Sequence, residues 1–180
     1  FSIVNTTFLR ALPYPDSDRL VWVSERAHDS DDISVSYPNY LDWCGQQDAF
    51  SALAVFRVNS AKLKTPDSVE LVSTAVVSGD FFTVLGAGAV QGRSLTAEDD
   101  RAGAAPVAWV THEAWQKYLA GDRELVGKTI QLEGQAVTVA GILPAGFQFF
   151  RRVDFYLPVA PHAQQLFLTM RGNHNDAHVL

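Results

Sequence analysis

Apolar residues along this chain recur with two different spacings, and the spacing changes at breaks rich in proline or glycine. Phe1, Val4, Phe8 and Leu12 follow the spacing of three to four residues that is typical of a helix. Pro13 and Pro15 prevent that helix from continuing, because proline lacks the backbone N–H and disfavours helical geometry in the residue before it. We therefore expect this segment to be the end of a helix that stops by about Leu12. Taken alone, this pattern also fits an amphipathic helix that packs on a soluble core.

A strand, a helix and two further strands are predicted after this break. Residues 20–24 are β-branched and aromatic, which favours a strand, and the polar residues 28–32 favour a break. Ser36 is expected to begin a helix that carries Tyr37, Tyr40, Leu41 and Cys44 on one face. Two strands follow at residues 50–64 and 69–77, joined by a turn at residues 65–68.

Residues 79–160 predict a second unit of mixed helices and strands. Its expected strands are residues 106–110, 129–132, 136–142 and 155–159, and its expected helices are residues 80–85 and 113–119, the second capped by Thr111. A loop over residues 88–103 carries the acidic residues Glu98, Asp99 and Asp100, and a last strand is expected at residues 177–180. The fold class is therefore α+β, with two subdomains packed together.

Charge and cysteine content exclude several classes of protein. The chain of 180 residues has a net charge of −6, whereas binding to nucleic acid requires clustered Lys and Arg. A nucleic-acid partner is therefore not expected. Its single cysteine, Cys44, excludes an internal disulfide framework and every zinc site built from several cysteines. No apolar run approaches the roughly 20 residues that span a bilayer, so we expect any membrane segment to lie outside these residues.

Candidate catalytic signatures fail on inspection, and we expect no catalytic, cofactor or metal site. Residues 121–129 resemble a phosphate-binding loop, but the glycine spacing is one residue too long and the segment leads into a strand. His174 and His178 lack an evident third ligand, and a polar chain end is the preferred interpretation. Cys44 beside Trp43 is typical of a small buried apolar residue.

An ordered series of short motifs resembles the extracytoplasmic domain of MacB-type ABC transporter permeases, and most closely their branch of duplicated orphan permeases. The motifs are Leu12-Pro13-Tyr14-Pro15, Asp18-Arg19-Leu20-Val21, Ser36-Tyr37-Pro38, Asp42-Trp43, Val77-Ser78-Gly79-Asp80-Phe81-Phe82, Val84-Leu85-Gly86, Gly92-Arg93, Glu98-Asp99-Asp100, Pro106-Val107, Gly127-Lys128-Thr129-Ile130, Ala140-Gly141-Ile142-Leu143-Pro144, Gly146-Phe147, Leu157-Pro158 and Arg171-Gly172-Asn173-His174. They extend over nearly the whole chain in the order found in that family.

This resemblance implies a particular division of the chain. Residues 1–15 would be the end of a membrane-proximal helix, and residues 16–78 the first part of a porter-like subdomain. A sabre-like subdomain would be inserted at residues 79–160. Residues 161–180 would return toward the porter-like subdomain and leave it incomplete, so that an unpaired edge favours a homodimer.

The function that the resemblance implies is mechanical. ATP hydrolysis would occur in a separate ABC ATPase subunit or domain, while this periplasmic domain would transmit conformational change across the membrane for export or efflux. Its expected partners are a periplasmic adaptor or a substrate protein, and membrane attachment would come from flanking helices. Two alternatives stay open: a stand-alone binding module for carbohydrate or peptide, and, with less support, a hydrolase that uses Glu98, Asp99 and Asp100.

One loop is a candidate surface for contact with a partner protein. It comprises Phe147, Phe149, Phe150, Arg151 and Arg152, which combine apolar and basic side chains between two predicted strands. The alternative is that this loop folds back on the core. The tryptophans Trp22, Trp43, Trp109 and Trp115 are expected to anchor the core.

Overall fold

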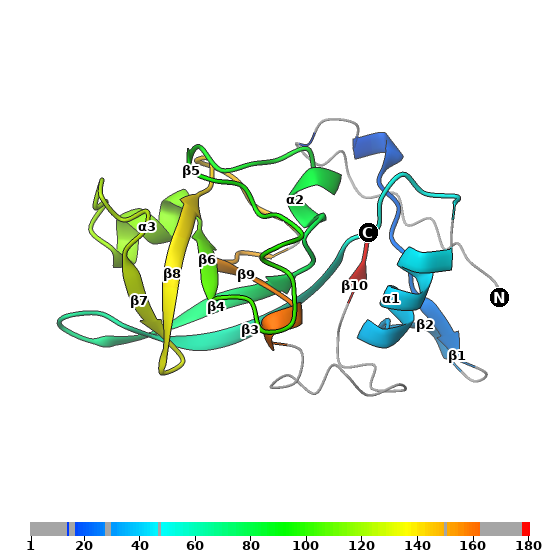
Figure 1. The fold of residues 1–180 in the computed structure, drawn as a ribbon, viewed down its shortest axis with the longest axis horizontal. Helices are drawn as coiled ribbons and strands as arrows, with labels where there is room; N and C mark the ends of the chain where they lie inside the picture. Colours follow the sequence, from blue (N-terminus) through cyan, green and yellow to red (C-terminus); the bar gives the residue numbers. More distant parts are fainter. Residues whose placement is uncertain (1–13, 15–16, 28–29, 47, 150, 163–177) are drawn as a thin grey trace.

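The computed structural model describes residue 14 and residues 17–27, 30–46, 48–149, 151–162 and 178–180 (Figure 1). Its helices are η1 (Ser17–Arg19), α1 (Tyr37–Gln46), α2 (Phe81–Val84), α3 (His112–Tyr118) and η2 (Ala160–His162). Its strands are β1 (Glu25–Ala27), β2 (Ser30–Ile33), β3 (Val55–Lys64), β4 (Val69–Val77), β5 (Gln91–Gly92), β6 (Val107–Val110), β7 (Thr129–Leu132), β8 (Gln135–Ile142), β9 (Phe155–Pro158) and β10 (His178–Val179). The α+β class predicted from the sequence is confirmed.

The central feature of the fold is a closed ring of paired strands, which we call the strand ring. In order around the ring, β3 pairs with β4, β4 with β9, β9 with β6, β6 with β8, β8 with β7, and β7 again with β3. The contact that closes the ring is short, since β7 meets β3 only at Leu63 and Lys64. Closure removes most of the unpaired strand edges that an open sheet would leave.

Alternate residues of the ring strands fill its interior, as the two-residue period of a strand requires. The buried side chains that point inward come from every strand of the ring and include Leu63, Val72, Phe155, Val110, Val139 and Ile130. The same apolar cluster contains Trp115 of α3 and Tyr37 and Tyr40 of α1. One continuous core therefore joins the ring to both helices.

The opposite faces of several ring strands are buried as well, beneath α2 and the loops. Trp109, Tyr156, Ala75 and Phe56 pack there with Phe81 and Phe82 of α2. Tyr156 lies between the two rings of α2, with ring centroids 5.9 Å from Phe81 and 5.4 Å from Phe82. Every residue of β6 and β9 is buried, so these strands bury both faces, which accounts for their continuous apolar sequences.

The segment at the C-terminal end of the chain lies against the start of β3. Its β10 pairs antiparallel with Val55 and Phe56, and Leu180 and Ala54 exchange backbone hydrogen bonds of 2.7 and 2.9 Å. Val23 forms an isolated bridge to Val179 on the other side of β10. The predicted strand at residues 177–180 is thus present in the described residues 178–179.

Most predicted elements occur close to their expected bounds. β4 coincides with the predicted strand at residues 69–77, and the hairpin of β7 and β8 turns at Glu133 and Gly134 as expected. The Thr111 hydroxyl accepts a hydrogen bond from the Ala114 N–H, which confirms the predicted helix cap. The helix expected at residues 1–15 lies outside the described residues, apart from Tyr14.

Two predictions in the first part of the chain were wrong. Residues 20–24 do not form a strand beyond the single bridge at Val23. β1 instead pairs with β2, which includes residues 30–32 of the polar break expected at residues 28–32. On α1, Leu41 and Cys44 are exposed although the helical spacing grouped them with the buried Tyr37 and Tyr40. α1 buries a face narrower than its spacing suggests.

The predicted division between residues 78 and 79 falls between β4 and α2. Strands on both sides of that position belong to the strand ring. The division into a porter-like and a sabre-like subdomain stays a prediction. Within the described residues, no helix is both long and apolar enough to cross a membrane.

Gly92 supplies a specific test of how β5 is held against β8. Its φ of +79° disfavours any side chain, and a Cβ at this position would collide with the Ala140 carbonyl oxygen and lie 2.9 Å from the Gly141 Cα. We expect Gly92→Ala to lower the free energy of unfolding by more than about 2 kcal/mol. Urea denaturation of the purified domain measures this change.

Gly103 is the matched control for that substitution. Its φ is +81°, but a Cβ there would meet no atom within 4 Å. Gly103→Ala should therefore cost only the backbone term of about 1 kcal/mol. Equal losses in the two variants would show that the close approach of β5 to β8 contributes nothing to stability.

Candidate functional site

The candidate contact loop after β8 is folded back on the core at its two described phenylalanines. Phe147 and Phe149 are only 9% and 3% exposed. The Phe147 ring centroid lies 5.7 Å from that of Phe82, and the Phe149 centroid lies 5.3 Å from that of Phe81. Phe147 also contacts Tyr156 of β9, and Phe149 also contacts Phe56 of β3. Exposure of these two rings to a partner is therefore contradicted, and the alternative of a loop folded back on the core holds for them. Phe150 lies outside the described residues.

The basic half of the same loop is exposed. Arg151 and Arg152 both face solvent, and the Arg152 Nε lies 4.0 Å from the Asp154 Oδ1. Asp154 is itself buried and accepts a hydrogen bond of 2.9 Å from the Ser73 N–H through Oδ2. Contact of the two arginines with a partner stays a prediction.

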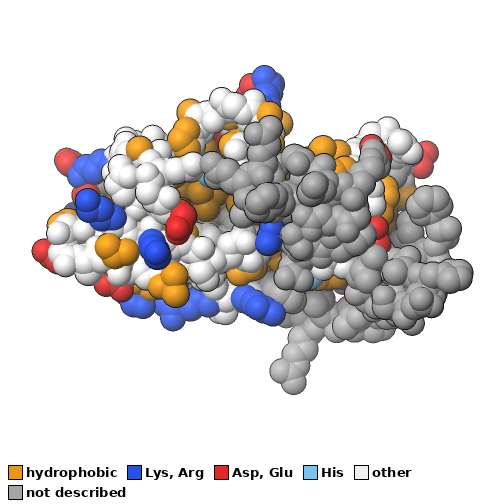
Figure 2. All heavy atoms as spheres, turned by 90° about the horizontal axis from the view of Figure 1, so that it is seen from below, with side chains coloured by type: hydrophobic (Ala, Val, Ile, Leu, Met, Phe, Trp, Pro, Cys, Tyr) orange, Lys and Arg blue, Asp and Glu red, His pale blue; other side chains and the backbone are white. Residues whose placement is uncertain are grey.

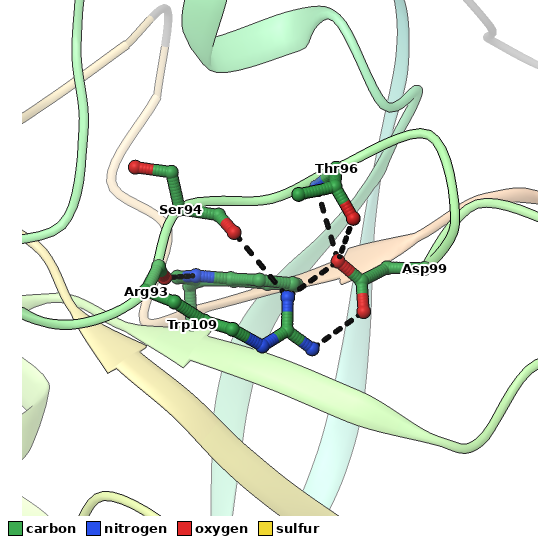
Figure 3. Close-up of polar contacts among 5 residues, drawn as sticks. All are labelled: Arg93, Ser94, Thr96, Asp99 and Trp109. Carbon is green, nitrogen blue, oxygen red and sulfur yellow. Dashed lines mark hydrogen bonds and ion pairs between the residues drawn. The ribbon is translucent and has the colours of Figure 1, made fainter.

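The acidic segment at residues 98–100 is organised by an ion pair (Figure 3). The two terminal guanidinium nitrogens of Arg93, Nη1 and Nη2, each donate to one oxygen of the Asp99 carboxylate at 2.6 Å. The same carboxylate accepts hydrogen bonds from the Thr96 N–H at 3.0 Å and the Thr96 hydroxyl at 2.8 Å. These bonds, the Arg93 pair first among them, lower the pKa of Asp99 below its ordinary value.

This ion pair is fixed to the outer face of β6 by Trp109. The indole N–H donates a hydrogen bond of 2.7 Å to the Arg93 carbonyl oxygen. The guanidinium carbon of Arg93 lies 5.7 Å from the centre of the Trp109 ring, within the range of a cation–π contact. Arg93, Asp99 and Trp109 therefore hold the long loop after α2 on the strand ring.

The neighbouring acids also form structural bonds. Asp100 accepts hydrogen bonds from the Gly79 N–H at 2.9 Å and from the Ala160 N–H at 2.7 Å, which joins the loop to the start of α2 and to η2. Burial raises the pKa of Asp100. Glu98 pairs with Arg101 on the surface. This arrangement gives the hydrolase interpretation no support, because Asp99 and Asp100 hold the loop and Glu98 is paired with Arg101 at the surface.

The other residues considered for chemistry are not brought together. The ring of His178 lies 4.7 Å from that of Trp22 and 5.3 Å from that of Phe56, while His174 lies outside the described residues. No group of three or more potential metal ligands occurs among the residues that were placed. Cys44 is exposed, which corrects the expectation that it is a buried apolar residue.

A cavity of about 330 Å³ opens where β3 separates from the hairpin of β7 and β8. Its walls combine inward-facing apolar side chains of the ring, such as Val76 and Val137, with the polar side chains of Asn59 and Gln135. The cavity follows from the short β3–β7 contact, because β7 ends at Leu132, opposite Leu63, and does not extend along β3 as far as Ala61.

A surface that the sequence reasoning missed lies on the hairpin of β3 and β4. Val69 and Leu71 are 63% and 72% exposed, and their register partners across the hairpin are Lys64 and Lys62. We call these four residues the hairpin face. The space-filling view in Figure 2 shows apolar side chains among charged ones at the end of the molecule where this hairpin projects. The predicted turn at residues 65–68 implies this pairing, so combining the turn with strand alternation could have found it.

The Arg93–Asp99 pair predicts a specific dependence of stability on pH. A carboxyl whose pKa is lower in the folded chain than in the unfolded chain stabilises the fold above the unfolded pKa, and this contribution is lost as pH falls through the folded pKa. We expect Asp99→Asn to lower the free energy of unfolding by about 1–2 kcal/mol at neutral pH, since Arg93 is half exposed. The difference from the unsubstituted domain should shrink below about pH 4.

Glu98→Gln is the control, because it removes the exposed pair with Arg101 in the same loop. It should change stability by less than about 0.5 kcal/mol at every pH. Urea denaturation followed over a pH series compares both variants. A loss for Asp99→Asn that stays constant down to the acid limit would contradict the ionic role of Asp99.

Comparison with known proteins places this fold among transporter domains. The structure resembles the periplasmic region of MacB from Actinobacillus actinomycetemcomitans with a TM-score of 0.62 and 19% identity, over 86% of this chain and 66% of that one. It also resembles the extracellular domain of the noncanonic ABC-type transporter YknZ from Gram-positive bacteria, with a TM-score of 0.62 and 16% identity, over 82% of this chain and 73% of that one. At these identities the likeness concerns the fold. A search of curated proteins found no match.

Comparison of the sequence with family profiles identifies the family as well as the fold. The profile described as the MacB-like periplasmic core domain matches residues 1–178. The resemblance to MacB-type permeases that the ordered motifs predicted is therefore confirmed. The chain belongs to the family of MacB-like periplasmic core domains.

Proposed function

We propose that this chain is the extracytoplasmic domain of a MacB/FtsX-type ABC transporter permease and that it transmits conformational change across the membrane for export or efflux. The observation that carries the proposal is the family match over residues 1–178. The domain itself would be non-catalytic, with ATP hydrolysis in a separate subunit or domain. Membrane attachment would come from helices that flank these residues in the full-length permease.

The packing of the strand ring supports a mechanical role. Force can pass through a domain only if the domain does not deform, and close-packed cores resist deformation. β4, β6 and β9 are buried on both faces, and the ring is closed by hydrogen-bonded pairing. The Arg93–Asp99 pair and Asp100 add polar bonds that hold the longest described loop to this body. A movement at one end of the domain would thus reach the other end.

A periplasmic adaptor or a substrate protein is the proposed partner, and a homodimer is a further possibility of assembly. Arg151 and Arg152 stay part of the proposed contact surface because both are exposed. Their guanidinium groups can form bidentate bonds with carboxylates of a partner.

The exposed Cys44 tests the extracytoplasmic location directly. In intact cells that make the full-length permease, a membrane-impermeant maleimide should label Cys44. Because burial of part of the side chain raises the thiol pKa, labelling should accelerate at mildly alkaline pH. Cys44→Ser is the control for any other cysteine of the full-length protein. Labelling that appears only after cell lysis would place this domain on the cytoplasmic side.

Transmission of conformational change requires a second measurement. An environment-sensitive fluorophore on Cys44 of the purified full-length permease, assembled with its ATPase and reconstituted in lipid, should change its emission when ATP is added. An ATPase variant that binds but does not hydrolyse ATP separates the binding step from hydrolysis. If transport proceeds while the emission stays constant in every nucleotide state, the domain does not move with the ATPase cycle.

A further inference from the structure

We propose that the outer edge of β4 at residues 69–71, together with the hairpin face, binds an extended segment of a partner protein that carries apolar side chains and carboxylates. This inference deepens the partner contact of the proposed function and rests on it for the location of the partner. Three features support it: the open main-chain edge of β4, the exposed apolar side chains of Val69 and Leu71, and the positive charges of Lys62 and Lys64.

The main chain of β4 leaves one edge open beyond the strand ring. The β4–β9 pairing begins at Thr74, whereas the β3–β4 pairing extends to Val69. Ser73 bonds with Asp154 on the outer side through both its N–H and its carbonyl oxygen. Because alternate residues of an antiparallel strand point their polar groups the same way, Leu71 and Val69 direct theirs to this side too. In the described part of the chain, no strand pairs with β4 there.

The side chains beside that edge are apolar where solvent would favour polar residues. Val69 and Leu71 are two of the few large apolar side chains exposed among the described residues. They stand on one face of β4, two positions apart, so a strand added at the edge would place its own alternate side chains against them. Strand addition of this kind draws affinity from main-chain bonds and selectivity from such side-chain contacts.

Charge decides which segment would fit. Lys62 and Lys64 flank the two apolar residues on the same face, and both are exposed. At physiological ionic strength, salt screens charges that lie more than about 8 Å apart. The two nearby lysines therefore attract or repel a bound segment more strongly than the net charge of the whole domain does. Carboxylates on the partner would pair with them. A second copy of this chain would bring the same lysines and repel.

A protein segment also fits this site better than a lipid surface. Exposed N–H and C=O groups of a strand edge are satisfied by another main chain, which lipid headgroups do not supply. In Figure 1 the tip of this hairpin lies at the opposite end of the molecule from α1, β1 and β2.

Two short labelled peptides of matched length test the proposal by fluorescence anisotropy with the purified domain. Each presents Val and Leu on one face of an extended chain, followed on that face by two glutamates in one peptide and two lysines in the other. We expect the glutamate peptide to bind about tenfold or more tightly than the lysine peptide, with the difference shrinking at high salt.

Substitutions on the hairpin face locate the binding. Leu71→Thr keeps the strand propensity but removes the apolar contact, and should weaken binding of the glutamate peptide about tenfold. Lys62→Glu with Lys64→Glu should reverse the preference to the lysine peptide. Val90→Thr is the matched control, since Val90 is 60% exposed elsewhere on the surface. It should leave binding unchanged, and urea denaturation verifies that every variant is folded.

Three outcomes would overturn the inference. The first is equal binding of both peptides, or no binding of either. The second is self-association of the domain, measured by sedimentation, that Leu71→Thr abolishes, which would assign the edge to a second copy. The third is binding to phosphatidylglycerol vesicles that requires the two lysines, which would assign it to a membrane. Failure of Cys44 labelling in intact cells would reject the proposed location without affecting these peptide measurements.

Discussion

The short pairing of β7 with β3 is the contact on which the rest of this structure depends. Without it, the sheet would be open between the end of β3 and β7, and Leu63 and Leu132 would lose their place inside the strand ring. Closure lets alternate residues of every ring strand share one interior. It also leaves the opposite faces of β4, β6 and β9 free to bury a second cluster beneath α2. Trp109 belongs to that second cluster, and its indole in turn positions Arg93 and the acidic loop. The position of the acidic loop therefore depends, through Trp109 and the strand ring, on the pairing of β3 with β7.

Most elements in residues 55–160 were predicted correctly, because strand composition, helix caps and turn residues there agree with the fold. The run of β-branched residues at 69–77 is β4, Thr111 caps α3, and Glu133 and Gly134 turn the β7–β8 hairpin with positive φ. The first part of the chain follows different rules. Residues 20–24 have the composition of a strand, but the one backbone bridge described there joins Val23 to Val179, near the other end of the chain. Strand composition specifies no partner, so tertiary contact decides.

The same holds at the candidate site: the sequence identified its residues, but not the contacts they make with residues far away in the chain. The sequence identified the aromatic and basic loop after β8, but periodicity carries no information about the contacts that Phe147 and Phe149 make with the two rings of α2. The acidic residues are likewise explained by contacts over distance: Asp100 receives N–H groups from Gly79 and Ala160, which lie far from it in sequence. Two of the three carboxylates that the sequence offered to a less supported hydrolase hypothesis, Asp99 and Asp100, anchor a loop in the fold. Family motifs such as Gly92-Arg93 and Glu98-Asp99-Asp100 therefore coincide with structural bonds.

Most of β4 is buried on both faces, but its first residues are exposed because the cover over its outer face is short. α2 and the aromatic cluster cover the outer face of β4 at Ala75 and Val77, but that cover ends before Leu71. Where a strand extends beyond the elements that cover it, its exposed positions are usually polar. Lysine or proline at an open edge usually prevents another chain from pairing there. Here the outward positions of the edge strand keep Val69 and Leu71, while the lysines stand on β3, one strand away from the edge. Lysines placed there do not block the main-chain groups of β4. They place two positive charges directly beside the apolar pair, on the side away from the open edge, which favours a partner segment that carries carboxylates.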